Sequence, residues 1–164
     1  MDGYKIVYPR IVISTPSFSK AKLFGSGMGV SVIMGENFGK IVFPEISDEI
    51  PASSNLAIMS RDLTVPMTDW ENLREMGYEK LFSPNEWAEI LYFNLISRYG
   101  RSFFKTEAKT NLSYLELKDR RILAVYALLN SENGIWRFGA NSLDDKRRED
   151  VGRRLFSRNS DKKK

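Results

Sequence analysis

The chain of 164 residues is long enough for one domain with a sizeable core. It contains no cysteine and no histidine, which excludes disulfide frameworks, thiolate and histidine catalysis and most transition-metal sites. The formal net charge of +4 equals that of residues 144–164 alone, which carry nine basic and five acidic side chains. Such asymmetry indicates an anionic partner or a solubilising tail. Without a long apolar run or a signal-peptide pattern, we expect an intracellular protein with no membrane span.

The first third of the chain predicts an antiparallel β-meander. Its stretches are rich in Val, Ile, Phe and Tyr and are separated by Pro, Ser and Gly, as strands are. Pro9 and Pro44 each remove a ladder donor, which favours edges or bulges. The expected strands are residues 4–15, 19–24, 29–34 and 40–46, with one more at 56–67.

Five of the eleven glycines lie between residues 23 and 43. The spacing of the first three is G-x-G-x-G, and a β-branched run follows, whereas a dinucleotide fingerprint needs G-x-G-x-x-G before a helix. We therefore interpret them as turn residues and not as a phosphate loop. Positive φ is expected at Gly25, Gly27, Gly35 and Gly39.

Two helices are expected after the strands. Residues 68–71 (TDWE) and 83–86 (SPNE) fit the capping box, and Gly77 and Gly100 are placed to end the two helices. The second helix, residues 84–99, is apolar around nearly its whole circumference, which predicts a buried helix packed against the sheet.

The stretch 112–134 is compatible with two structures. Ser113 and Glu116 form a third capping box, and Leu115, Ile122 and Tyr126 recur at helical spacing, which favours a helix. The alternative is a hairpin that turns at residues 118–121 (KDRR). A short strand at 135–139 and a final helix at 142–159, beginning at Ser142, are expected beyond it.

Together these elements predict an α+β protein in which an N-terminal β-meander packs against C-terminal helices. Residues 1–141 are expected to form a single globular domain. Residues 142–164 are expected to form a basic C-terminal helix and tail.

The final helix supplies most of the candidate binding residues. At about 100° per residue, Arg147, Arg154 and Arg158 form a row on one side of the helix, which suits the phosphates of a nucleic-acid backbone. The candidates are Lys146, Arg147, Arg148, Arg153, Arg154 and Arg158, together with Trp136 and Arg137 just before the helix.

Two observations keep other interpretations open. Leu143, Val151 and Leu155 share the side of the arginine row, so this face of the helix could dock onto the domain or onto a protein partner. Trp136 and Phe138 flank Arg137 in a strand, so either the two aromatics or the arginine face solvent. Exposed aromatics would stack on single-stranded bases, and buried aromatics would belong to the core.

Evidence for catalysis is slight. The E-x-K triplets at 107–109 and 116–118 occur in magnesium-dependent nucleases, but no aspartate lies between Asp69 and Asp119 to complete such a site. Glu45, Asp48 and Glu49 offer calcium oxygens without the spacing of an EF-hand loop. We expect no enzyme activity, no metal and no cofactor.

The sequence thus predicts a non-catalytic nucleic-acid-binding protein that contacts the backbone of RNA or single-stranded DNA through its basic C-terminus. The alternative is a protein-interaction or assembly module that uses a sheet edge or the C-terminal helix, including a homo-oligomer paired through the edge.

Overall fold

The computed structural model describes residues 3–25, 28–96, 103–105, 110–130, 132–143, 148–149 and 152–159. It is an α+β structure, as the sequence predicts, with one seven-stranded mixed sheet in the order β1-β5-β11-β7-β8-β9-β3. The strands of this sheet are β1 (Tyr4–Thr15), β5 (Ser53–Leu63), β11 (Arg154–Arg158), β7 (Asn111–Glu116), β8 (Ile122–Asn130), β9 (Ile135–Ser142) and β3 (Ser31–Met34). Two short pairs accompany it, β10 (Arg148–Glu149) with β6 (Met67–Thr68) and β2 (Phe18–Ser19) with β4 (Glu49–Ile50).

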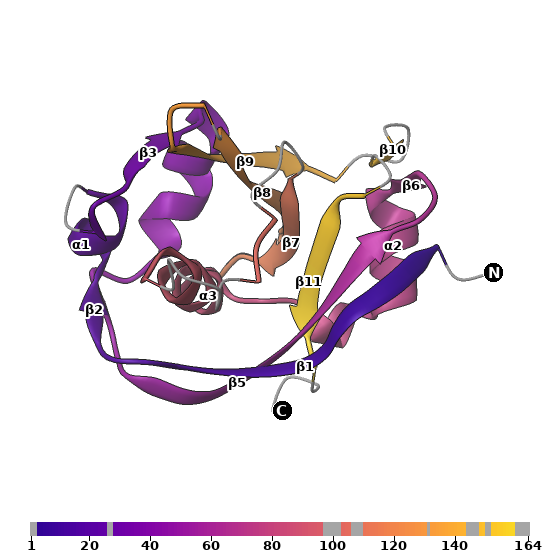
Figure 1. Ribbon diagram of the computed structural model, residues 1–164, viewed down its shortest axis with the longest axis horizontal. Helices are drawn as coiled ribbons and strands as arrows, with labels where there is room; N and C mark the ends of the chain where they lie inside the picture. Colours follow the sequence, from indigo (N-terminus) through magenta and orange to yellow (C-terminus); the bar gives the residue numbers. More distant parts are fainter. Residues whose placement is uncertain are drawn as a thin grey trace.

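The sheet curves around the helix α3 (Pro84–Ile96), which is seen end-on in Figure 1, whereas α2 (Asp69–Met76) lies outside the curve. Both capping boxes are confirmed. Ser83 Oγ accepts a hydrogen bond from the Glu86 N–H at 3.2 Å, and Thr68 Oγ1 accepts one from the Glu71 N–H at 3.2 Å. Gly77 ends α2 with a φ of 96°, while Gly100 lies outside the described residues.

The central strands are buried on both faces. One face of β8 places Leu123, Val125 and Ala127 in the large core around α3, which confirms the prediction of a buried helix. The opposite face packs Ala124 and its neighbours against Leu73 and Met76 of α2. Because the strands of this region are sandwiched between helices, their sequences lack the simple alternation of a half-exposed strand.

Two predicted strands are wrong. Residues 19–24 mainly form the short helix α1 (Lys20–Phe24), because Ser19 Oγ caps it by accepting a hydrogen bond from the Lys22 N–H. Residues 40–46 lie mostly in the π-helical turn η2 (Phe38–Val42) and the 3₁₀ turn η3 (Phe43–Glu45), which bury Phe38 and Val42 in the core. A further 3₁₀ turn, η4 (Tyr78–Lys80), follows α2.

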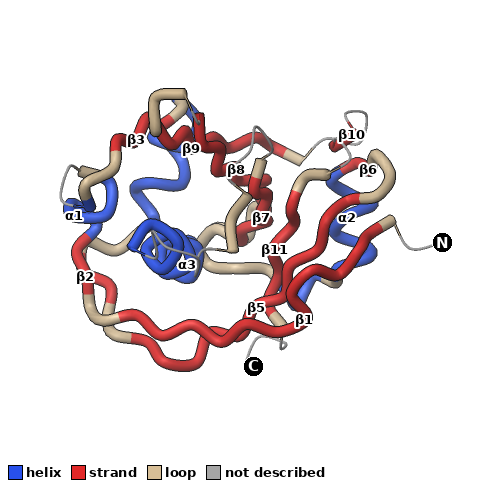
Figure 2. The backbone as a smooth tube through the Cα atoms, in the orientation of Figure 1, coloured by secondary structure: helices blue, strands red, loops and turns tan. Residues whose placement is uncertain are grey.

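The strands of the first third of the chain do not pair with one another as a meander. β1 pairs antiparallel with β5, and β3 pairs in parallel with β9, more than a hundred residues away in sequence (Figure 2). Since β1 comes first in the strand order, its Pro9 lies on an edge strand, as expected, whereas Pro44 lies in the turn η3 and not in a strand.

The favoured helix at 112–134 is also wrong, and the alternative hairpin is correct. β7 and β8 pair antiparallel, and the turn at KDRR is closed by hydrogen bonds between Leu117 and both Arg120 and Arg121. Arg120 adopts a φ of 73°, the left-handed position that a three-residue hairpin loop requires. Tyr114 pairs with Ala124 across the two strands, and both are buried. This burial stabilises the hairpin more than the helical spacing of apolar residues would stabilise a helix.

The expected C-terminal helix is wrong where the structure describes it. Residues 154–158 form β11, which lies between β5 and β7 inside the sheet. Leu155 and Phe156 are 1% and 0% exposed on opposite faces of β11, which a strand allows. Gly152, with a φ of 88°, turns the chain into the strand, and its N–H donates to the Leu63 carbonyl.

The prediction of a positive φ at Gly25, Gly35 and Gly39 is wrong. The described glycines with positive φ are Gly29, Gly77, Gly134 and Gly152. Gly25 was expected among them but has a φ of −96° at the end of α1, and Gly27 lies outside the described residues. Within the part of the chain that the structure describes, no helix is long and apolar enough to cross a membrane.

Candidate nucleic-acid interface

Arg154 and Arg158 do not form a surface row. Arg154 binds both carboxylate oxygens of Asp62, at 2.8 and 3.1 Å, and donates to the Phe103 carbonyl at 3.0 Å. Arg158 pairs with Glu86 of α3. These two guanidinium groups connect β11 to its neighbours, so their assignment to nucleic-acid binding is corrected: a central strand directs its charged side chains to partners within the fold.

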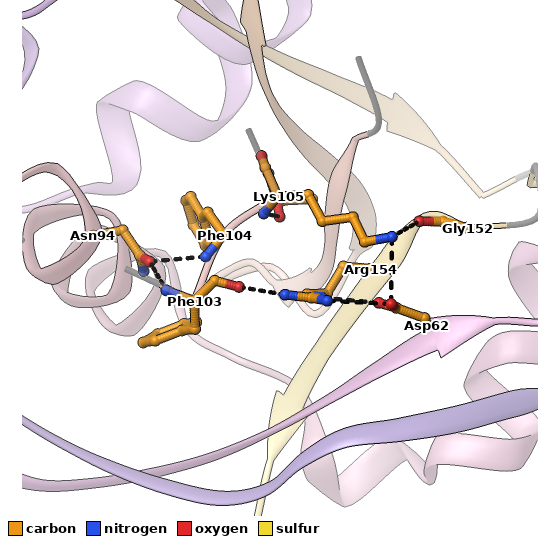
Figure 3. A network of polar contacts seen from close by, with 8 residues as sticks. Asp62, Asn94, Phe103, Phe104, Lys105, Gly152 and Arg154 are labelled. Atoms are coloured by element: carbon orange, nitrogen blue, oxygen red, sulfur yellow. Dashed lines mark hydrogen bonds and ion pairs between the residues drawn. The ribbon is translucent and has the colours of Figure 1, made fainter. Parts of the chain in front are cut away.

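The surroundings of Arg154 form a polar network between β5, β11 and the segment 103–105 (Figure 3). Lys105 Nζ lies 3.3 Å from Asp62 Oδ2 and donates to the Gly152 carbonyl at 2.7 Å. Asn94 of α3 accepts hydrogen bonds from the N–H groups of Phe103 and Phe104. Partial burial raises the pKa of Asp62, but the hydrogen bond and charge of Arg154 and those of Lys105 outweigh it, so this pKa is lowered.

Trp136 lies in the core, where it is 6% exposed, and Phe138 is 1% exposed. Their assignment as stacking residues is corrected, because β9 turns both aromatics toward α3. Arg137, which points to the opposite side of β9, is exposed, as the alternation of a strand requires. Lys146 and Arg147 lie outside the described residues, and the structure gives only the strand backbone of Arg148.

Arg137 lies on what we call the outer face, the side of β8 and β9 that faces away from α3; α2 covers this side at Ala124, and Tyr126 is partly buried beside it. Directly across from Arg137 is Leu128, and the next pair along is Tyr126 with Gly139. Because Gly139 has no side chain, β9 places no side chain over the ring of Tyr126 at this position. A Cβ added at Gly139 would lie 3.9 Å from Cδ2 of Tyr126. The guanidinium carbon of Arg153 lies 6.0 Å from the centroid of the Tyr126 ring. The outer face thus carries two of the predicted residues, Arg153 over the ring of Tyr126 and Arg137 opposite Leu128, the next residue of β8 on the same face.

A surface depression of about 410 Å³ lies where β8 begins and β9 ends. We call it the Trp70 depression; its lining residues are Trp70, Arg120, Arg121, Ile122, Leu123, Ser142 and Leu143. Trp70 is 41% exposed, and Arg74 follows one turn later on α2. Arg121 pairs with Asp119 at 2.7 Å, while the side chains of Arg74 and Arg120 form no ion pair within the described ranges.

Sequence reasoning missed Trp70, Arg120 and Arg121. The signal that could have found them is the turn KDRR: had the hairpin been preferred, its two arginines would have been placed at an exposed loop tip. Trp70 is the second residue after the predicted helix cap Thr68, in the first turn, where a side chain readily faces solvent.

A second, smaller depression, of about 160 Å³, lies near the start of α3 and contains Glu45, Glu116 and Lys118. The Lys118 N–H donates to Glu45 Oε1 at 2.7 Å. Among the residues that the structure describes, no group of three or more acidic side chains lies close enough to hold a metal ion. Glu107 and Lys109 of the other triplet lie outside the described residues.

The fold and surface therefore define an α+β protein whose curved sheet encloses one helix and presents arginine and aromatic side chains on the outer face. Comparisons with family models, with curated proteins and with solved structures found no match to this chain.

Proposed function

We propose that this protein binds single-stranded nucleic acid, RNA or DNA, without catalysis, along the outer face of β8 and β9. The observation that carries the proposal is the arrangement of exposed and half-buried arginine and aromatic side chains along one side of two adjacent strands. Arg120 and Trp70 lie at one end, Tyr126 and Arg153 in the middle, and Arg137 at the other end.

The dimensions and chemistry of this face support a strand of several nucleotides. From Ile122 to Leu128 the strand β8 advances about 20 Å, at roughly 3.3 Å per residue, and α2, which carries Trp70, covers it at Ala124. Phosphates would pair with arginine guanidinium groups, and bases would stack on the aromatic rings, a combination that serves single strands better than duplexes. Lys146, Arg147 and Arg148 stay predicted contributors to the same electrostatic attraction.

Arg120 supports the proposal in a second way. Its left-handed φ of 73° is a position that glycine or asparagine adopts with less strain, so arginine is not the residue that the backbone favours there. Strained positions of this kind concentrate at functional sites.

The test is fluorescence anisotropy of full-length protein with labelled single-stranded RNA, single-stranded DNA and duplex DNA of equal length, over a salt series. We expect tighter binding of the single strands and a linear fall of log affinity with log salt. Arg137→Ala and Arg120→Gly should each weaken binding several-fold and lower the salt slope by about 1. Arg120→Gly is informative because glycine adopts the left-handed φ of this position with less strain than arginine. The variant should therefore be at least as stable as the unchanged protein, and a loss of binding would not result from a loss of stability.

Arg10→Ala is the matched control, because Arg10 is an exposed arginine of β1, at the opposite edge of the sheet. If all variants bind as the unchanged protein does, or if nothing binds, the proposal is wrong. The alternative function is then a protein partner or a second copy at β1. That strand has no neighbour on its outer edge within the described structure and exposes Ile6 and Val12.

A further inference from the structure

Trp70 is the exposed member of the three tryptophans. It is 41% exposed, whereas Trp87 and Trp136 are 1% and 6% exposed and belong to the core around α3. An indole left in water forgoes the stabilisation that burial would give it. Its ring is therefore accessible to a ligand, whereas the rings of Trp87 and Trp136 are not.

The helix that carries Trp70 is fixed in position. Tyr114 Oη of β7 donates to Asp69 Oδ1 at 2.8 Å, and Asn72 Nδ2 donates to Tyr114 Oη at 3.0 Å. Asp69, Asn72 and Tyr114 are all fully buried. The indole is thus held on a rigid element, which is what a preorganised stacking site requires.

The walls of the Trp70 depression differ in chemistry. Ile122, Leu123 and Leu143 supply apolar surface, while Arg120 and Arg121 supply positive charge. The ion pair of Arg121 with Asp119 is solvent-exposed, with side chains 58% and 54% exposed, so a phosphate can replace the carboxylate at little cost. The volume of about 410 Å³ falls within the usual range of small-ligand sites, about 300–1,000 Å³.

We propose that the Trp70 depression binds one nucleotide unit, with its base stacked on the indole of Trp70 and its phosphate held by Arg120 and Arg121. A nucleotide joins a flat ring to a phosphate, and the depression offers an aromatic and apolar surface for the ring and arginine side chains for the phosphate. For a unit within a strand, this inference rests on the proposed function. A free mononucleotide has the same chemistry, so the experiment separates the two sources.

The experiment is a titration of intrinsic tryptophan fluorescence in full-length protein, with a single-stranded oligonucleotide in one arm and adenosine monophosphate in the other. Because the other two tryptophans are buried, quenching by a stacked base reports on Trp70. We expect the oligonucleotide to quench the signal. Trp70→Ala should abolish the quenching and weaken binding of the oligonucleotide about tenfold.

Two further variants keep the result interpretable. Trp70→Phe retains a stacking ring and should keep most of the affinity. Tyr78→Ala removes an aromatic side chain that is 49% exposed but lies outside the depression, so it should bind like the unchanged protein. Circular dichroism of each variant checks that the fold is intact.

Each outcome of these titrations supports or overturns the inference. Quenching by the mononucleotide at the concentrations that suffice for the oligonucleotide supports the site and assigns it to free nucleotides. If Trp70→Ala binds the oligonucleotide as tightly as the unchanged protein while Arg137→Ala binds it weakly, this inference is overturned and the proposed function stands. If neither ligand binds by fluorescence or anisotropy, both are overturned.

Discussion

At the scale of single residues, the charge of Asp62 decides how the C-terminal strand is held. One carboxylate serves two cations, Arg154 at 2.8 Å and Lys105 at 3.3 Å, and its side chain is 20% exposed. If the carboxylate is removed, Arg154 and Lys105 keep their charges in partly buried positions without a counter-charge. The resulting loss of stability is larger than the loss expected when an exposed ion pair is broken.

The pKa of Asp62 predicts how its contribution depends on pH. Because this pKa is lower in the folded than in the unfolded chain, the stabilisation is present above about pH 4 and disappears as the pH falls through the folded-state pKa. Asp62→Asn should therefore lower the free energy of unfolding by about 1–3 kcal/mol at neutral pH, and the difference should shrink in acid. Urea unfolding at several pH values measures it.

Glu36→Gln is the control for that prediction. Glu36 and Lys40 form an exposed i,i+4 pair, with side chains 76% and 71% exposed, so its loss should change stability by less than about 0.5 kcal/mol. A deficit in Asp62→Asn that stays constant from neutral to acidic pH would contradict the role given to the carboxylate charge.

At the scale of elements, a substitution at Gly152 distinguishes the helix expected for the C-terminal segment from the strand that the structure shows. In a helix, Gly152→Ala would stabilise the protein by up to about 1 kcal/mol. At the observed φ of 88°, the same change should destabilise it by about 1–2 kcal/mol, because a Cβ is strained in the left-handed region. Thermal unfolding of the variant measures the sign, and a gain in stability would contradict the strand.

Gly39→Ala is the matched change for that measurement. Gly39 lies in η2 without a positive φ, and a Cβ added there would contact nothing within 4 Å. The substitution should leave stability unchanged or slightly raised, since it only restricts the unfolded chain.

At the scale of the whole molecule, the sheet is completed by the end of the chain. β11 pairs with β5 on one side and with β7 on the other, so it joins the β1-β5 pair to the remaining strands. A chain ending at Asn141 lacks this central strand and should lose its cooperative thermal transition. A chain ending at Asn159 retains β11 and the hydrogen bond from Asn159 Nδ2 to the Pro9 carbonyl, and should unfold as the full chain does.

Circular dichroism during heating distinguishes the two truncations. A native-like transition in the chain ending at Asn141 would contradict the place of β11 in the sheet. For the same reason, deletion of residues 142–164 cannot test nucleic-acid binding, and single substitutions on the outer face are the appropriate variants.

The sequence by itself determined the α+β class, the exclusion of Pro9 from a central strand, and two of the three helices predicted from capping boxes; the third capping box, Ser113 and Glu116, lies in the strand β7. These features depend on local chemistry, because a hydroxyl that caps a helix or a missing N–H acts within a few residues. It also indicated that Arg137 or its aromatic neighbours would face solvent, since alternation along a strand is local as well.

The tertiary structure alone decided the order of the strands, the placement of β11 and the composition of the candidate interface. Residues 154–158 carry no local signal for a central strand. They become one because β5, some ninety residues earlier, pairs with β11 and supplies Asp62 to Arg154, while the two core clusters bury the faces of β11. Likewise, Trp70 and Arg120 lie fifty residues apart in sequence, and only the packing of α2 beside the β7–β8 turn brings them to one depression. Non-local pairing of this kind depends on the summed burial of many side chains, which no short stretch of sequence contains.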